Sequence, residues 1–119
     1  MLNFRFRQFP LRMHKYAMNA AITSELFNNS RQFWSIHDQL YSLNTKVQPH
    51  NLKIVLSHMN MDYNHISNAQ RDGAIKRVEK DIHVGKLFGV DSTPSLFLCY
   101  PNGDVYRIYS LGQLDDIIR

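Results

Sequence analysis

The last third of the sequence predicts a long helix that leads into a β-hairpin. The helix is expected from Asp72 to Phe88 and should end at Gly89, because glycine is favoured just past a helix end. The run from Ser95 to Tyr100 is apolar on both sides, which is typical of a strand buried within a sheet. The turn Pro101 to Asp104 contains Asn-Gly and returns the chain as an antiparallel strand from Val105 to Tyr109.

The remaining sequence predicts one strand and several helices. Leu2 to Phe9 alternates apolar and polar residues, which indicates a strand with one face in water. Apolar residues at helical spacing predict helices at His14 to Phe27, Arg31 to Ser42, Asn51 to Met59 with Pro49 in the first turn, and Leu111 to Ile118, with a brief turn from Asp62 to Ile66. In 119 residues this order predicts one α/β domain, with helices covering the sheet.

Composition excludes several classes of function. The formal charge is +4, but the basic residues are scattered, so we expect no nucleic-acid binding. No apolar run approaches the ~18 residues of a membrane helix, and we expect no membrane contact. The first residues do not form a signal peptide, which predicts a cytoplasmic protein as written.

No catalytic residue, metal site or cofactor is predicted. Cys99 is the single cysteine, so the chain encodes no internal disulfide, and we expect its thiol to face the core. The histidines His50, His58 and His65 lack the spacing of helical metal ligands. His37 should pack and Asp38 should face water, since adjacent helical residues point about 100° apart and form no hydrogen-bonded dyad.

Three segments together resemble the DsbA-like branch of the thioredoxin-fold family of thiol:disulfide oxidoreductases. FRFRQFPL at Phe4 to Leu11 is similar to the strand and Phe-Pro-Leu that follow the redox helix of that family. RQFWSIHDQLY at Arg31 to Tyr41 resembles its Phe-Trp helix. VEKDIHVGKLFGVDSTPSLFLCYPNGD at Val78 to Asp104 resembles the stretch in which a helix, Gly-Val, Thr-Pro and a hairpin follow one another.

The resemblance implies a thioredoxin-like fold over residues 1–119, with a helical insertion at about 17–86. It further implies that the Thr93-Pro94 bond is cis and that Ser92, Thr93 and Pro94 present the backbone to an extended peptide, which pairs by β-augmentation. A rigid turn that leads into a strand is the alternative interpretation of Thr93-Pro94.

The family's central strand and Cys-x-x-Cys helix have no counterpart before Pro10. The missing strand would lie between the strands at Leu2 to Phe9 and Ser95 to Tyr100. Either these two strands pair directly, or a homodimer or strand-swapped assembly supplies the central strand. Three functions stay open: a redox-inactive module that binds peptides or forms assemblies, a truncated oxidoreductase whose catalytic segment lies upstream, and a relative of the kappa-type glutathione transferases. The family usually works in the periplasm or otherwise outside the cytoplasm, which conflicts with the lack of an export signal.

Overall fold

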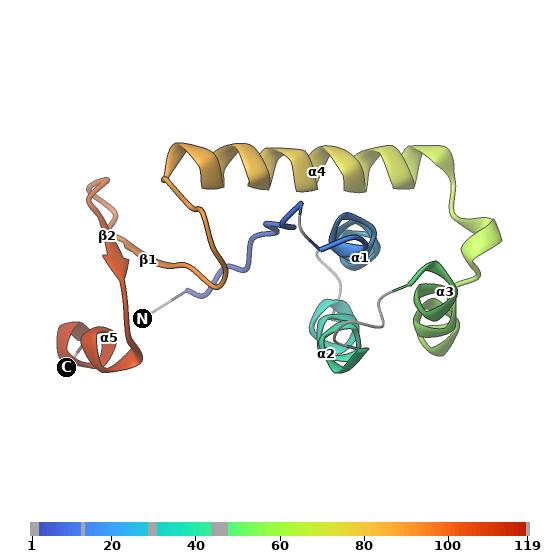
Figure 1. Cartoon of the computed structure of the whole chain (residues 1–119), viewed down its shortest axis with the longest axis horizontal. Coiled ribbons are helices and arrows are strands. Elements are labelled where there is room, and N and C mark those ends of the chain that lie inside the picture. Colours follow the sequence, from blue (N-terminus) through green and yellow to red (C-terminus); the bar gives the residue numbers. More distant parts are fainter. Residues whose placement is uncertain (1–2, 13, 29–30, 44–47, 119) are drawn as a thin grey trace.

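Helices form the larger part of the chain (Figure 1). The computed structural model describes residues 3–12, 14–28, 31–43 and 48–118. The elements are, in chain order, α1 (Ala17–Glu25), α2 (Phe33–Leu43), α3 (Pro49–His58), the 3-10 helix η2 (Tyr63–His65), α4 (Asn68–Leu87), β1 (Leu96–Cys99), β2 (Val105–Ile108) and α5 (Leu111–Ile118). This order confirms the predicted helices and hairpin, with shifts of a few residues at their ends.

The long helix α4 begins four residues before the predicted start. Ser67 and Gln70 form a capping box, in which the Ser67 hydroxyl accepts from the Gln70 N–H at 3.1 Å and the Gln70 side chain accepts from the Ser67 N–H at 2.9 Å. The helix ends before Gly89, whose φ of 75° suits glycine. Leu87 in the last turn of α4 is 70% exposed, because this turn lies past α1 (Figure 1).

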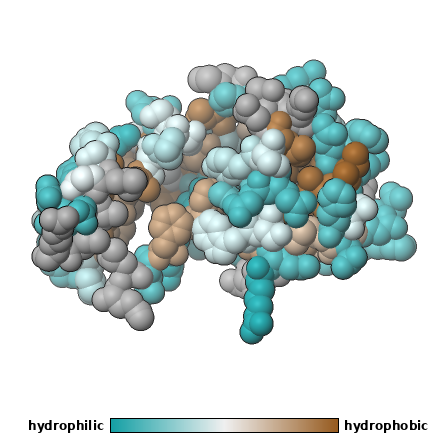
Figure 2. All heavy atoms as spheres, turned by 90° about the horizontal axis from the view of Figure 1, so that it is seen from below, coloured by the Kyte–Doolittle hydropathy of each residue, from teal (hydrophilic) through white to brown (hydrophobic). Residues whose placement is uncertain are grey.

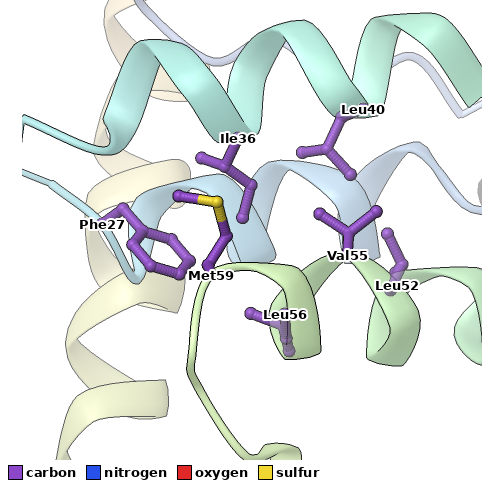
Figure 3. Close-up of a cluster of buried hydrophobic side chains, with 7 residues drawn as sticks. All are labelled: Phe27, Ile36, Leu40, Leu52, Val55, Leu56 and Met59. Atoms are coloured by element: carbon purple, nitrogen blue, oxygen red, sulfur yellow. The ribbon is translucent and has the colours of Figure 1, made fainter.

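A cluster of seven buried apolar side chains joins the helices (Figure 3). It draws on the end of α1, on α2 and on α3: Phe27, Ile36, Leu40, Leu52, Val55, Leu56 and Met59. Helix α4 packs separately on α1, where Ala74 and Val78 are fully buried. Burial of side chains of this size contributes about 1.5–3 kcal/mol each relative to exposure, so these contacts hold α1–α4 together as one helical body.

The hairpin is a two-stranded antiparallel sheet in the part of the chain that the structure describes. Leu96 pairs with Ile108 and Cys99 with Val105, and Gly103 takes a φ of 96° in the turn. The prediction that this strand lies inside a sheet is therefore wrong: β1 is an edge strand. Cys99 is exposed rather than packed in the core for the same reason.

The hairpin and α5 stand apart from the helical body (Figure 1). Within the described ranges β1 packs on β2 and α5 on β2, whereas the main contacts of α1–α4 are among themselves. Phe88, just after α4, reaches the hairpin through its ring contact with Phe97, at 5.2 Å between centroids. The Cα radius of gyration is 15.8 Å, compared with about 13.5 Å for a compact domain of this length. The chain is therefore more extended than a compact domain of the same length.

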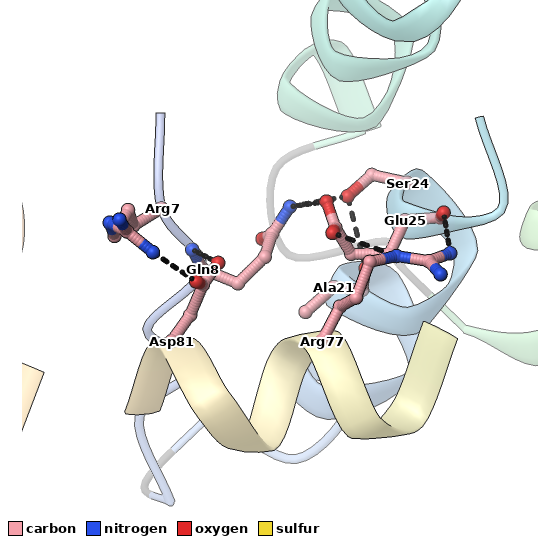
Figure 4. A network of polar contacts seen from close by, with 7 residues as sticks. All are labelled: Arg7, Gln8, Ala21, Ser24, Glu25, Arg77 and Asp81. Atoms are coloured by element: carbon pink, nitrogen blue, oxygen red, sulfur yellow. Dashed lines mark hydrogen bonds and ion pairs between the residues drawn. The ribbon is translucent and has the colours of Figure 1, made fainter. Parts of the chain in front are cut away.

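The predicted strand at Leu2 to Phe9 is absent over its described residues, 3–9, which form an extended segment without strand pairing. Side chains take the place of a partner strand (Figure 4). The Gln8 N–H donates to one carboxylate oxygen of Asp81 on α4 at 2.9 Å, and Arg7 Nη1 donates to the other at 3.0 Å. The buried Gln8 side chain donates to Ser24 on α1 at 2.7 Å. These bonds fix the segment to both helices.

Replacing Asp81 with alanine should therefore release the N-terminal segment. The backbone N–H of Gln8 loses a charged acceptor, so we expect a loss of about 1–3 kcal/mol in the free energy of unfolding, measured by urea denaturation. Glu79→Ala is the matched control, because Glu79 is exposed on the same helix. Equal stabilities of the two variants would contradict the anchoring role.

The contact between Phe9 and Gly85 gives a second prediction. A methyl group at Gly85 would lie 2.6 Å from the Phe9 ring, whereas one at Gly73 on the same helix would meet only the end of Arg77 at 3.3 Å. Both alanine variants gain about 1 kcal/mol of helix propensity, but Gly85→Ala overpacks Phe9 at a cost of about 1–3 kcal/mol. Thermal unfolding should place Gly85→Ala below Gly73→Ala, and the reverse order would count against the packing of Phe9 on α4.

Candidate functional site

The outer edge of β1 is the first candidate site. The Tyr100 N–H donates to the Asp104 carbonyl at 2.8 Å. This bond fixes which residues of β1 direct their backbone N–H and C=O groups toward β2 and which direct them away. In the register observed, Leu98 and Leu96 also point their backbone groups toward β2. Phe97 and Cys99 then direct their N–H and C=O groups away from β2, to an edge that no strand of the described chain covers. An edge of this kind is ready to pair with another strand.

The loop before β1 holds the predicted peptide-binding residues. Ser92, Thr93 and Pro94 are all exposed, and the Thr93-Pro94 bond is cis, as predicted. Ser95 fixes the end of the loop: its hydroxyl donates to the Ser92 carbonyl at 2.7 Å and accepts from Arg107 on β2 at 3.3 Å. The loop is thus held next to the open edge.

Large apolar side chains are exposed on both strands of the hairpin. Five large side chains of the hairpin and its ends are more than a third exposed: Leu96, Tyr100, Val105, Tyr106 and Tyr109. Single exposed apolar residues are ordinary, but a group on one small sheet marks a contact surface. The apolar sequence of β1 predicted a strand buried within a sheet, but no segment of the described chain covers its outer edge.

A groove beside the N-terminal segment is the second candidate site. It encloses about 610 Å³ and is lined by aromatic side chains together with charged ones from α1 and α4. Phe4 and Trp34 are 70% and 45% exposed, with ring centroids 5.9 Å apart. The described lining residues come from the N-terminal segment and the helical body, so the groove is distinct from the gap between that body and the hairpin in the view from below (Figure 2). Sequence reasoning missed this groove, although the Phe-Arg-Phe-Arg run was its signal.

His37 lies in the aromatic cluster behind this groove. Its ring is 4.7 Å from that of Phe6, 5.2 Å from Trp34 and 4.4 Å from Tyr41, centroid to centroid. The predicted packing is confirmed. The expectation that His37 and Asp38 form no hydrogen-bonded dyad is wrong: His37 Nδ1 lies 3.4 Å from the Asp38 carboxylate. Asp38 itself faces water.

The remaining predicted positions do not form a chemical site. His50, His58 and His65 are all exposed on α3 and η2. In the described ranges, no three His, Cys, Asp or Glu side chains come together in a way that could hold a metal ion. No described helix has both the length and the apolar character needed to cross a membrane.

Known proteins provide a further finding. The chain is 32% identical over 99 residues to a protein of Nitrosospira multiformis named Na(+)/H(+) antiporter NhaA, a match that covers 82% of this chain and 16% of the relative. Antiporters NhaA 1 of Salinispora arenicola and NhaA 3 of Salinispora tropica are each 28% identical over 100 residues, or 82% of this chain and 15% of the relative. No family model and no solved structure matches. The chain spans about one sixth of the length of these curated relatives.

The relatives correct the interpretation drawn from the resemblance. All three are named as Na(+)/H(+) antiporters, and none as a thiol:disulfide oxidoreductase or a glutathione transferase. The DsbA-like assignment and the three functions based on it were therefore wrong. The motifs behind it, a Phe-Trp helix, a Gly-Val helix end, Thr-Pro and an Asn-Gly turn, specify local backbone structure, which unrelated activities can share. The similarity found in this chain is to a stretch of antiporter-named proteins.

Proposed function

We propose that this chain is part of a polypeptide of the Na(+)/H(+) antiporter type and acts there as a strand-docking unit. The outer edge of β1 receives an extended segment, and the loop Ser92, Thr93 and Pro94 guides it to the edge. The exchange of Na+ and H+ is a property of the whole polypeptide in this proposal. The observation that carries it is the edge of β1, which no strand of the described residues pairs with and which belongs to a sheet of two described strands.

Backbone geometry supports pairing at this edge. Phe97 and Cys99 offer two N–H and two C=O groups at alternate positions, which is the pattern that an added strand uses in β-augmentation. The exposed side chains of Leu96 and Tyr100, in and just after β1, provide apolar surface for the side chains of the segment. A two-stranded sheet is marginal in water, so an added strand would also stabilise the hairpin.

The occupant that we propose is an extended segment of the same polypeptide. The relatives are about six times longer than the stretch that matches, so such a polypeptide holds ample chain to supply a strand. A segment on the same chain is present at high effective concentration, which compensates for the small contact. A third strand would also bring the sheet closer to the α/β, thioredoxin-like arrangement that we propose for the fold.

Hydrogen exchange of the edge amides tests the proposal. A synthetic heptapeptide of alternating valine and threonine serves as a generic strand. Titration with it should slow the exchange of the Phe97 and Cys99 amides by about tenfold or more, as followed by NMR. The amides of Leu96 and Leu98 should change little, because they already bond to β2. Unchanged exchange at Phe97 and Cys99 in excess peptide would contradict docking at this edge.

Two substitutions at one position provide the matched control. Cys99→Pro removes the outward N–H, and proline is tolerated on edge strands where that group faces water. Cys99→Ala keeps the N–H. The proline variant should lose the peptide effect and the alanine variant should keep it. If the chain alone sediments as a dimer that Cys99→Pro dissociates, a second copy occupies the edge and the proposed intramolecular segment is wrong.

A further inference from the structure

The groove beside the N-terminal segment has the features of a binding site separate from β1. Its aromatic wall consists of Phe4, Phe6 and Trp34, in which each of the two phenylalanine rings lies about 6 Å from the indole. Phe4 is 70% exposed although it lies against Trp34. Rings that meet one another and still face water can take up a further apolar side chain between or upon them. The wall therefore indicates an aromatic or aliphatic ligand group.

The charges of the groove are unbalanced. Four cations, Arg5, Arg7, Arg77 and Lys80, line it with two carboxylates, those of Glu25 and Asp81. Arg7 pairs with Asp81 at 3.0 Å and Arg77 with Glu25 at 3.5 Å (Figure 4). Arg5 and Lys80 are exposed and form no ion pair with a described residue. Two positive charges thus stay available at the groove for an anionic ligand.

We infer that this groove binds an extended acidic peptide segment that inserts an aliphatic or aromatic side chain against Phe4 and Trp34. The carboxylates of the segment pair with Arg5 and Lys80. A nucleic acid also combines anions with flat rings, but it carries a negative charge on every nucleotide, whereas Arg7 and Arg77 of the groove are already paired with Asp81 and Glu25. A peptide can place single carboxylates only where the free cations lie. This charge pattern therefore favours the peptide.

Trp34 gives a direct readout, because it is the only tryptophan in the chain. The probe is a synthetic octapeptide in which glutamate alternates with leucine, and a lysine-leucine octapeptide is its counterpart. On titration, the glutamate peptide should shift Trp34 emission to shorter wavelength as the indole leaves water, whereas the lysine peptide should not. Absence of a shift, or an equal shift with both peptides, would overturn the inference.

A matched pair of double variants separates a local site from the general effect of net charge. Arg5→Glu with Lys80→Glu removes the two free cations of the groove, and the affinity for the glutamate peptide should fall by about tenfold or more. Arg12→Glu with Lys76→Glu makes the same change in net charge at exposed positions that do not line the groove. Equal losses in both variants would show non-specific attraction and would overturn the inference.

Four further measurements complete the test. Circular dichroism of both double variants should match the parent protein, and Phe4→Ala, which keeps all charges, should also weaken binding. An eight-nucleotide oligothymidylate should bind more weakly than the glutamate peptide, and tighter binding would overturn the choice of a peptide. Cys99→Pro should leave the Trp34 response unchanged, so failure of strand docking at β1 and failure of this groove are distinguishable.

Discussion

The Asp81 carboxylate holds the N-terminal segment in place, and this segment forms one wall of the aromatic groove. One oxygen accepts the backbone N–H of Gln8 and the other accepts Arg7, so a segment without a partner strand still has a fixed place beside α4. That place puts Phe4 and Phe6 against Trp34 and forms one wall of the groove. The same segment runs through the space between the helical body and the hairpin (Figure 1).

Local chemistry made the helices and the hairpin predictable from sequence. Pro49 at the start of α3, Gly89 after α4 and Gly103 in the turn each satisfy a backbone requirement that needs only neighbouring residues. The start of α4 was missed because the Ser67 and Gln70 capping box lies before the apolar pattern of the helix, and the prediction followed that pattern. The sequence therefore contained the information for those helix ends that depend on neighbouring side chains.

Positions that depend on distant partners could not be predicted in this way. The alternation in residues 3–9 fits a strand, but pairing requires a second strand, and Asp81, more than seventy residues away, bonds the segment instead. Cysteine is usually buried, but Cys99 is exposed on β1, whose outer edge has no neighbouring strand among the described residues. Arg5 and Lys80 are far apart in sequence, and only the fold brings both to one groove. The cis bond at Thr93-Pro94 was anticipated from a resemblance that the relatives do not support.

The separation between the hairpin and the helical body has a consequence for affinity. The edge of β1 and the aromatic groove belong to parts joined mainly by the short connection after α4 and the Phe88–Phe97 contact. Two ligands that each engage one part would bind with little mutual influence. A single ligand long enough to reach both would gain avidity, because its second contact forms without a new encounter in solution. Length, rather than the strength of either contact, would then decide which ligands are retained.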